Sequence, residues 1–297
     1  MDRYEQRLLQ VLQQSLSQPQ LSYSDLPRFR QQLCSGLHAY STLYNAVFLA
    51  AQAQTPGMAF LAAYQNTIRC LDADCPKDQL AAFCVSEKGV KKPWDMKTQL
   101  VEAKPHSLLT GQKGYVMLLP DELDRLYVIA KDDVGQLKCV FLSTNQEGIS
   151  ITEGLNAPFV EDIPHSGIRF EKVVIAETQV MKLDGHREAN RPFRYWEDVH
   201  ISLAMLAWML RECIEQGKKL AELDNLTEQI CQIIEKFEQQ PDYYSSDIFS
   251  LLDQSHELLD EQCKSLSQAS QRLWKKDRVL LQMGQKIRHF IQAKLAQ

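Results

Sequence analysis

Two adjacent carboxylates, Glu197 and Asp198, stand near the start of an apolar helical pattern that runs from Phe193 to Gln216, and His200 follows them. A carboxylate can act as a general base, and a histidine can relay the proton. The alternative is structural, because acidic residues in the first turns of a helix are favoured by the helix dipole, and a histidine here can simply pack. The residue types alone leave both interpretations of Glu197 and Asp198 open.

Arginines and cysteines offer little further chemistry. Arg191, Arg194 and Arg211 can meet a phosphate, but solvated helix arginines are the common alternative. The eight cysteines are scattered singly, and the one close pair, Cys70 and Cys75, lacks the CxxC spacing. This pattern favours reduced thiols in a cytosolic protein over a metal site or a disulfide framework.

A central region from Ala81 to Lys182 is the only long part of the chain that lacks a helical pattern. It consists of short runs rich in Val, Ile, Tyr and Phe, bounded by Gly, Asp, Asn and Pro, which is typical of strands and turns. The expected strands lie near 81–86, 99–104, 113–118, 125–131, 137–143, 148–153 and 167–175. Their spacing predicts an antiparallel sandwich or barrel, with a hairpin turn at Asp132–Gly135.

Helical periodicity precedes and follows this central region. The fold class is therefore α+β, with an N-terminal helical domain at 1–78, a β-domain at 79–186 and a four-helix bundle at 187–297. The bundle is expected to consist of four long antiparallel helices, the last from about Leu273 to Ala296. Ile201–Leu210 is apolar nearly all round and should lie centrally in it.

Composition excludes several classes of protein. The formal net charge of the 297 residues is −5, and no basic block stands out. The sequence therefore lacks the basic patch that is typical of nucleic-acid-binding proteins. The first residues, Met1–Glu5, are polar and no apolar segment follows them, so we expect no secretory signal. The longest apolar stretches, such as Ala46–Ala53, are too short to span a bilayer. We expect a cytoplasmic protein with no membrane or nucleic-acid partner.

The order of these elements and four sequence segments resemble the acyl-CoA dehydrogenase family. Leu80–Gly89 is similar to a family strand that ends in Thr/Ser-Glu-x-Gly, and Gly111–Val116 resembles its Gly-x-Lys-x-aromatic-Ile strand. Ile163–Ile175 resembles the segment that leads to the bundle, and Trp274–Arg278 the Arg-Asp region before the last helix. The resemblance implies a flavoenzyme in which a carboxylate takes the α-proton of an acyl-CoA thioester and FAD takes the β-hydride.

The chain departs from the family at four places. Val90–Asp95 replaces a Gly-Ser-Asp turn that holds flavin and thioester, and Met117 replaces a Thr or Ser that bonds the flavin ring. No Gln-x-x-Gly-Gly-x-Gly loop, which binds the adenosine of FAD, occurs between Leu220 and Gln271. Leu281–Gly284 stands where many members carry a Glu-Gly-Thr base. We therefore expect FAD binding to be weak or lost.

The resemblance also assigns residues. It implies that Ser86, Tyr115 and Met117 bind the cofactor and that Glu197 or Asp198 is the base, facing the cleft from the bundle. Trp94 is a second aromatic residue that can stack on a flavin ring. The alternative is that Ser86 merely ends a strand and that the aromatic residues pack. No metal site is expected.

Three functions remain open. The first is flavin-dependent α,β-dehydrogenation of an acyl-CoA or a related thioester. The second is a degenerate, flavin-poor family member that acts as a binding or assembly protein, and the third is a flavin monooxygenase-like relative. The colour of the purified protein discriminates among them, since a flavoprotein is yellow. Family bundles pack against one another, so we also expect a homodimer or a larger assembly.

Overall fold

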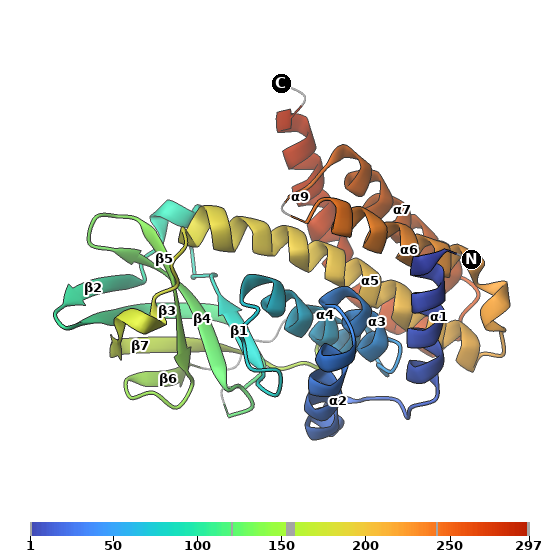
Figure 1. Ribbon diagram of the computed structural model, residues 1–297, viewed down its shortest axis with the longest axis horizontal. Coiled ribbons are helices and arrows are strands. Elements are labelled where there is room, and N and C mark those ends of the chain that lie inside the picture. The colour runs from blue at the N-terminus through green and yellow to red at the C-terminus, as the bar shows by residue number, and fades with distance from the viewer. Residues whose placement is uncertain (1, 120, 153–157, 242, 296–297) are drawn as a thin grey trace. The chain divides into compact units, whose positions relative to one another are not determined.

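The computed structural model describes residues 2–119, 121–152, 158–241 and 243–295. Figure 1 shows its helices and strands. The described α-helices are α1 (Arg3–Leu16), α2 (Leu26–Ala39), α3 (Thr42–Ala50), α4 (Pro56–Leu71), α5 (Arg191–Glu215), α6 (Asp224–Gln239), α7 (Ser246–Cys263), α8 (Gln268–Asp277) and α9 (Val279–Leu295). The strands are β1 (Ala81–Cys84), β2 (Gln99–Ala103), β3 (His106–Met117), β4 (Arg125–Asp132), β5 (Leu137–Ser143), β6 (Ile149–Thr152) and β7 (His165–Ile175).

The chain divides into two compact units. The first consists of Met1–Cys70, Pro158–Asp162 and Tyr195–Gln297, and the second of Leu71–Ala157 and Ile163–Arg194. The helices from both ends of the sequence therefore share one unit, and the strands form the other. The expected fold class, α+β with helices before and after a β-region, is confirmed.

The helices of the first unit begin where their sequences supply capping groups. The Asp2 carboxylate accepts a hydrogen bond from the Glu5 N–H at the start of α1, over 2.8 Å. The Thr55 hydroxyl accepts one from the Met58 N–H at the start of α4, over 3.1 Å. Because α1 is amphipathic, its apolar side chains Leu8, Val11 and Leu12 are buried, and the helix packs against α3 and α6.

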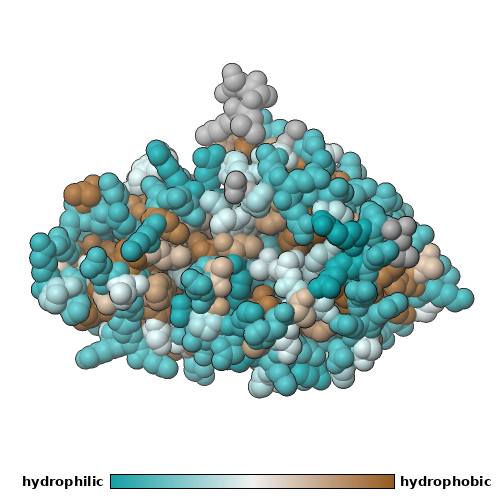
Figure 2. All heavy atoms as spheres, in the orientation of Figure 1, coloured by the Kyte–Doolittle hydropathy of each residue, from teal (hydrophilic) through white to brown (hydrophobic). Residues whose placement is uncertain are grey.

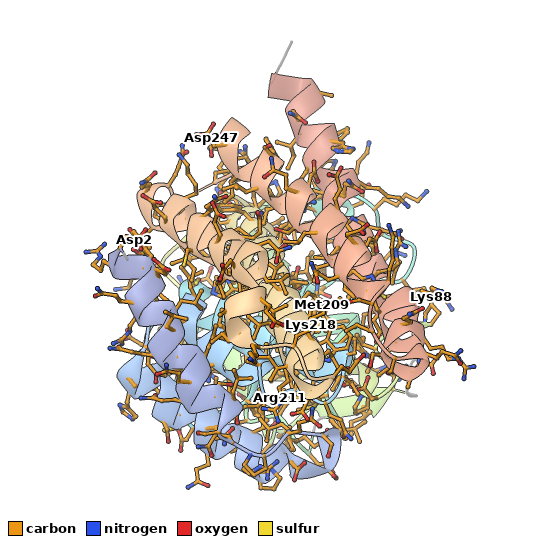
Figure 3. The ribbon with its side chains drawn as sticks, turned by 90° about the vertical axis from the view of Figure 1, so that its right-hand side faces the viewer. Asp2, Lys88, Met209, Arg211, Lys218 and Asp247 are labelled. Atoms are coloured by element: carbon orange, nitrogen blue, oxygen red, sulfur yellow. The ribbon has the colours of Figure 1, made fainter. Side chains whose placement is uncertain are left out.

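Helix α5 is the most deeply buried helix of the C-terminal region. Every residue from Leu203 to Leu210 is fully buried, which confirms the central position predicted from its apolar sequence. Met209 lies in this stretch, and Arg211 follows it (Figure 3). The guanidinium of Arg211 forms an ion pair with Glu215 over 2.7 Å and donates to the Leu16 carbonyl over 3.3 Å. Arg211 thus connects α5 to α1.

The last expected helix of the bundle is two helices. The sequence predicted one helix from about Leu273, but α8 begins at Gln268 and ends at Asp277, and α9 begins at Val279. The helix α8 begins early because the Ser267 side chain caps it by accepting from the Ser270 N–H over 3.2 Å. Beyond the break, α9 packs against α7 and α8.

The sheet is mixed, whereas the sequence predicted an antiparallel one. Its strand order is β1-β4-β2-β3-β7-β6, and β5 pairs with the other edge of β4. The pairs β1–β4 and β2–β4 are parallel, and the other pairs are antiparallel. Parallel pairing needs a long connection, and the β2–β3 hairpin supplies it between β1 and β4. Six strands lie within about two residues of their predicted bounds, with residue 153 outside the described residues, but β3 begins at His106 and not near the predicted residue 113.

Turn chemistry sets the best-defined hairpin. Between β4 and β5, the Asp132 N–H donates to the Gln136 carbonyl and the Gly135 N–H to the Asp132 carbonyl, as the predicted turn requires. Gly135 has a φ of +83°, which glycine adopts without strain. The surface shown in Figure 2 is mainly hydrophilic, with apolar residues interspersed. None of the described helices is both long enough and apolar enough to cross a bilayer.

Candidate functional site

The three expected cofactor-binding residues lie at one corner of the sheet. Ser86 follows the end of β1, and its carbonyl accepts a hydrogen bond from the Gly114 N–H of β3 over 2.9 Å. At this point β3 has an irregularity, because its pairing with β7 shifts between Lys113 and Val116. The bulge carries Tyr115, and Met117 ends the strand. The structure therefore brings Ser86 and the bulged strand together.

Tyr115 has a backbone conformation that a bulky residue seldom adopts. Its φ is +55°, and its side chain is 65% exposed. A left-handed conformation at such a residue costs roughly 1–3 kcal/mol and persists where the surrounding structure enforces it, often at ligand sites. Packing of the Tyr115 ring in a core does not offset this strain, because the ring lies at the surface. Leu118, Val160 and Lys172 also have positive φ, but Tyr115 combines it with an exposed aromatic ring.

The other two residues differ in what they present. Ser86 is exposed, and no described residue forms a hydrogen bond with its hydroxyl, which is therefore available as a donor. Met117 is only 3% exposed, and a thioether cannot donate a hydrogen bond. Ser86 and Tyr115 form a surface edge, whereas the Met117 side chain lies beneath it.

A buried ion pair lies directly beside this edge, and sequence reasoning missed it. The Lys113 ammonium donates to the Glu87 carboxylate over 2.7 Å and to the Val85 carbonyl over 3.3 Å. The two side chains are 0% and 5% exposed. Burial raises the pKa of Glu87, but hydrogen bonds from Lys113 and Thr98 outweigh it, so the net pKa lies below the ordinary value.

Burial has the opposite consequence for the cation. Desolvation is the largest influence on Lys113, and it holds the pKa of the ammonium below its ordinary value although Glu87 opposes the shift. The pair fixes Lys113 on the strand that carries the bulge, and Glu87 on the segment that carries Ser86. It therefore holds both halves of the Ser86–Tyr115 edge.

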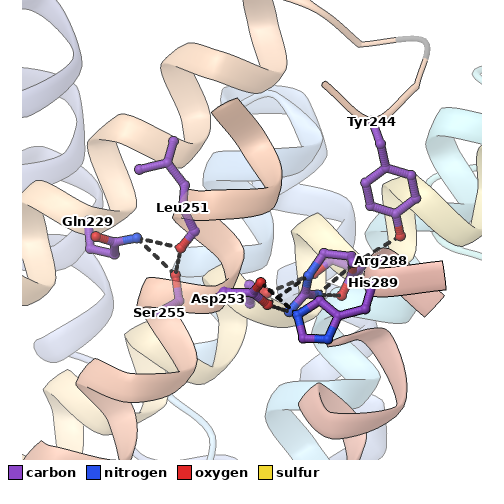
Figure 4. A network of polar contacts seen from close by, with 9 residues as sticks. Gln229, Tyr244, Leu251, Asp253, Ser255, Arg288 and His289 are labelled. Atoms are coloured by element: carbon purple, nitrogen blue, oxygen red, sulfur yellow. Dashed lines mark hydrogen bonds and ion pairs between the residues drawn. The ribbon is translucent and has the colours of Figure 1, made fainter. Parts of the chain in front are cut away.

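The two candidate bases lie in the other unit, on α5, and they differ in their surroundings. Both oxygens of Asp198 accept hydrogen bonds over 2.7 Å from one guanidinium nitrogen, Nη1 of Arg288, and Oδ2 also accepts from the Tyr244 hydroxyl over 2.9 Å (Figure 4). Arg288 and Asp198 are 1% and 5% exposed. The Asp198 carboxylate is thus fully engaged, whereas Glu197 is half-buried and makes a polar or electrostatic contact of its own.

Arg288 is shared with a second carboxylate. Its Nη2 donates to Asp253 of α7 over 2.6 Å, and Asp253 also faces His289 at 3.3 Å. Burial lowers the pKa of Arg288, but Asp198 and Asp253 more than offset this, so its pKa lies above the ordinary value. The network connects α5, α7 and α9.

Gly284 of α9 lies against the Asp198–Arg288 ion pair. A Cβ at this position would lie 2.3 Å from Oδ1 of Asp198 and 3.1 Å from Nη1 of Arg288. No side chain fits there without moving the ion pair. α9 thus approaches Asp198 closely at Gly284, within the segment where the family resemblance implies a Glu-Gly-Thr base.

The described surroundings of His200 do not support a role as a proton relay. It is fully buried, and desolvation lowers its pKa to about 4, so it is neutral near pH 7. Its Nδ1 donates to the Trp196 carbonyl over 2.7 Å, which leaves Nε2 as an acceptor 4.0 Å from Sγ of Cys70. Burial raises the pKa of that thiol to about 11. In the described part of the chain, no three His, Cys, Asp or Glu side chains are grouped so that they could hold a metal ion.

Comparison with solved structures identifies the fold. The apo form of PigA has a TM-score of 0.71 at 13% identity, with 100% of this chain and 98% of that chain covered. Butyryl-CoA dehydrogenase from Megasphaera elsdenii has a TM-score of 0.67 at 11% identity, covering 97% and 94%. The prolyl acyl carrier protein oxidase AnaB has a TM-score of 0.66 at 14% identity, covering 99% and 98%. No protein-family model and no curated protein matches the chain.

These similarities confirm the acyl-CoA dehydrogenase-like fold that the sequence resemblance predicted. PigA has also been solved with FAD and proline, so the fold accommodates that cofactor in a neighbour. At 11–14% identity the likeness concerns the fold alone.

The residues of this chain fit one half of FAD better than the other. Ser86 offers a free hydroxyl and Tyr115 an exposed ring, which suit the flat polar edge of a flavin ring. Nothing comparable is available for the adenosine half, because the chain has no glycine between Gly217 and Gly284. The turn after α6 is instead fastened to α5, where Tyr195 and Trp196 donate to the Gln240 and Pro241 carbonyls over 3.0 and 2.8 Å.

Proposed function

We propose that this chain is a flavin-dependent oxidoreductase that dehydrogenates an acyl thioester and binds FAD weakly. The observation that carries the proposal is the Ser86–Tyr115 edge. It combines an unengaged hydroxyl with a strained, exposed aromatic residue, and the buried Glu87–Lys113 pair holds it in place. Strained backbone conformations of this kind cluster at ligand sites.

Each residue has a distinct part in this proposal. The Ser86 hydroxyl donates a hydrogen bond to a polar atom at the edge of the ring, and Tyr115 packs against the ring. Bound FAD supplies the acceptor for the hydride. Glu197 is the proposed base for the α-proton, because both oxygens of Asp198 are occupied by Arg288 and Tyr244. Asp198 thus orients the start of α5 by tying it to α9.

The substrate class is an acyl thioester, either of coenzyme A or of a carrier protein. Both kinds occur in the names of proteins with this fold, butyryl-CoA dehydrogenase and the prolyl acyl carrier protein oxidase. The α-hydrogens of a thioester are acidic enough for a carboxylate base to remove one in a site without water.

FAD affinity is the first measurement. The chain lacks a side-chain donor at Met117, a Gly-Ser-Asp turn and a glycine loop, and each lost contact to a strongly polar group costs about 1.5–3 kcal/mol. Together they weaken binding by roughly three to six orders of magnitude, at about 1.4 kcal/mol per tenfold. We expect titration of the apo-protein, followed by flavin fluorescence and calorimetry, to show half-saturation above about 1 µM.

Two variants make this measurement specific. Ser86→Ala removes the donor, and Tyr115→Gly removes the ring while relieving the positive φ, so it should not lower stability. Both should weaken FAD binding by about tenfold or more, the effect of one hydrogen bond of about 1.4 kcal/mol. Submicromolar affinity, or stoichiometric flavin in the purified protein, would show that the missing motifs are compensated elsewhere. Unchanged FAD affinity in both variants would show that the Ser86–Tyr115 edge does not bind FAD.

A flavin-free binding or assembly protein is the second candidate, and the Asp198–Arg288 ion pair favours it. One of the two candidate bases is locked in a structural network, as expected where catalysis is no longer needed. If this candidate is correct, the protein binds an acyl thioester but neither FAD nor any variant of the edge changes that binding. Turnover of butyryl-CoA with saturating FAD and an electron acceptor excludes it.

We also propose a homodimer, located in the cytoplasm, where all eight cysteines stay free thiols. The apolar residues Met283 and Phe290 on α9 are exposed and lie on one face of the helix. Phe290→Asp should convert a dimer to a monomer at micromolar protein in sedimentation velocity, because an aromatic anchor is lost and a charge is buried. A clean monomer of the unaltered protein contradicts this prediction.

A further inference from the structure

The segment that replaces the expected Gly-Ser-Asp turn is a strongly basic loop. Between β1 and β2, residues 88–97 contain four lysines, Lys88, Lys91, Lys92 and Lys97, and one acid, Asp95. These residues carry a formal charge of +3, in a protein whose net charge is −5. We call them, together with the exposed Trp94, the lysine loop.

Hydrogen bonds give the lysine loop a defined structure. The Glu87 carboxylate, anchored by Lys113, accepts from the backbone N–H of Lys97 over 2.7 Å and of Thr98 over 3.1 Å, and so joins the two ends of the loop. Within it, the Met96 N–H donates to the Pro93 carbonyl over 3.2 Å, and the Met96 side chain is buried.

A further bond holds the tip of the loop. The Lys131 ammonium of β4 donates to the Trp94 carbonyl over 2.7 Å, and the Trp94 ring meets His186 edge-on with 6.5 Å between ring centroids. The Trp94 side chain is nevertheless 61% exposed. A tryptophan presented on a fixed backbone loses little conformational entropy when a partner covers it.

The lysines of the loop have no charge to neutralise within the described residues. All four are exposed, and none forms an ion pair with a described acid (Figure 3 labels Lys88). Two acids outside the loop are already engaged, because Glu87 pairs with Lys113 and Asp132 with Lys138 at 3.7 Å. The one acid of the loop, Asp95, leaves a surplus of positive charge that is available to a partner.

The residue types favour a protein partner over a small anion. Compact phosphate sites are built from arginine forks and from backbone N–H groups at helix N-termini. The lysine loop has no arginine, and its one helical turn, Pro93–Asp95, is too short to supply such donors. Exposed lysines around an aromatic anchor instead match a protein interface, where charges steer association and a central tryptophan contributes most of the affinity.

We infer that the lysine loop is the docking surface for an acidic protein that carries the thioester substrate, with Trp94 as its anchor. This inference rests on the proposed thioester chemistry for its substrate, but the docking surface stands on residues that the Ser86–Tyr115 edge does not use. An acidic carrier would be steered to the loop at low salt and held there by Trp94.

The test measures binding of holo acyl carrier protein, chosen for its acidic surface, to the full-length chain by calorimetry at low and high salt. The triple variant Lys88→Glu, Lys91→Glu, Lys92→Glu should weaken binding by about tenfold or more and reverse its salt dependence. Trp94→Ala should weaken it by about thirtyfold at both salt concentrations, the loss of about 2 kcal/mol expected for an anchor.

A matched variant separates local charge from net charge. Lys219, Lys275 and Lys286 are exposed residues of the helical unit, and changing all three to Glu alters the net charge equally. This control should change carrier binding less than about twofold, which is the range of a distant screened charge. Equal loss in the control and the loop variant, or wild-type binding in both loop variants, overturns the inference.

Two further outcomes distinguish this inference from the proposed function. If coenzyme A alone binds and the loop variants weaken it, the loop is a nucleotide site and the protein partner is wrong. If the protein binds FAD and turns over butyryl-CoA but does not bind holo carrier protein, the proposed function is supported and the proposed docking surface is wrong. Thermal unfolding of every variant confirms that each is folded before binding is compared.

Discussion

Replacing Arg288 by Met is expected to destabilise the helical unit by about 3–5 kcal/mol, the usual result of removing one partner of a buried ion pair. Arg288 is almost completely buried and contacts Asp198 on α5 and Asp253 on α7. Without it, two carboxylates remain in a site with little solvent, and Asp198 keeps only the Tyr244 hydroxyl. Urea unfolding followed by circular dichroism measures the loss.

A double variant shows whether the loss comes from the unpaired charge. Arg288→Met with Asp198→Asn removes both members of the pair and keeps an acceptor for Tyr244. It should recover most of the stability, because replacing a buried pair by neutral groups of similar size is often nearly neutral. A single variant that loses less than about 1 kcal/mol, the value of an exposed pair, would mean that water reaches the network.

The same site shows what sequence patterns can and cannot predict. The periodicity of Ile201–Leu210 predicted a buried helix, and the short apolar runs and turns between Ala81 and Ile175 predicted every strand, although the first half of β3 was missed. Those signals are local. The ion pair between Asp198 and Arg288 joins residues 90 positions apart, and no local pattern in either helix predicts it.

The direction of the paired strands could not be predicted either, because strand pairing also joins distant residues. Spacings of 8–12 residues between strands favour antiparallel neighbours, but β4 lies beside β1, more than 40 residues earlier in the chain, and the pair is parallel. The break at Arg278 was also missed, because apolar spacing continues across it.

Family resemblance selected residues that lie near one another but did not predict their surroundings. It brought Ser86, Tyr115 and Met117 into consideration together, and in the structure the Ser86 carbonyl bonds to Gly114 of the strand that carries the other two. It could not show that Met117 is buried, that Tyr115 is strained or that Asp198 is held by Arg288, because burial and φ depend on the whole fold. The Glu87–Lys113 pair lay within the quoted motifs, yet its members stand 26 positions apart.

That pair is the basis of the second large effect. Lys113→Met should destabilise the β-unit by about 3–5 kcal/mol at neutral pH, because the Glu87 carboxylate remains buried without its cation. Glu87 also joins the ends of the lysine loop and stands next to Ser86. The variant should therefore weaken FAD and carrier binding together, which neither Ser86→Ala nor Trp94→Ala does alone.

The pH dependence identifies the cause of this loss. In the unaltered protein the pKa of folded Glu87 is below its ordinary value, so the unfolded chain binds more protons between the two pKa values and stability rises with pH there. This contribution is fully present above the unfolded pKa of about 4.3. It disappears as pH falls through the folded value.

In Lys113→Met, burial acts on Glu87 without the opposing ammonium, so its pKa shifts upward. The difference in unfolding free energy between the two proteins should therefore be greatest near pH 7. It should shrink first as pH falls through the raised pKa of Glu87 in the folded variant, and further below about pH 4.3, where the unaltered protein loses the contribution of its carboxylate. Lys113→Met with Glu87→Gln should restore most of the stability near pH 7, because no unpaired charge remains buried. The single glutamine oxygen can still accept from one of the two N–H groups, that of Lys97 or that of Thr98. A stability difference that stays constant from pH 7 to pH 4 would show that Lys113 contributes packing and not charge.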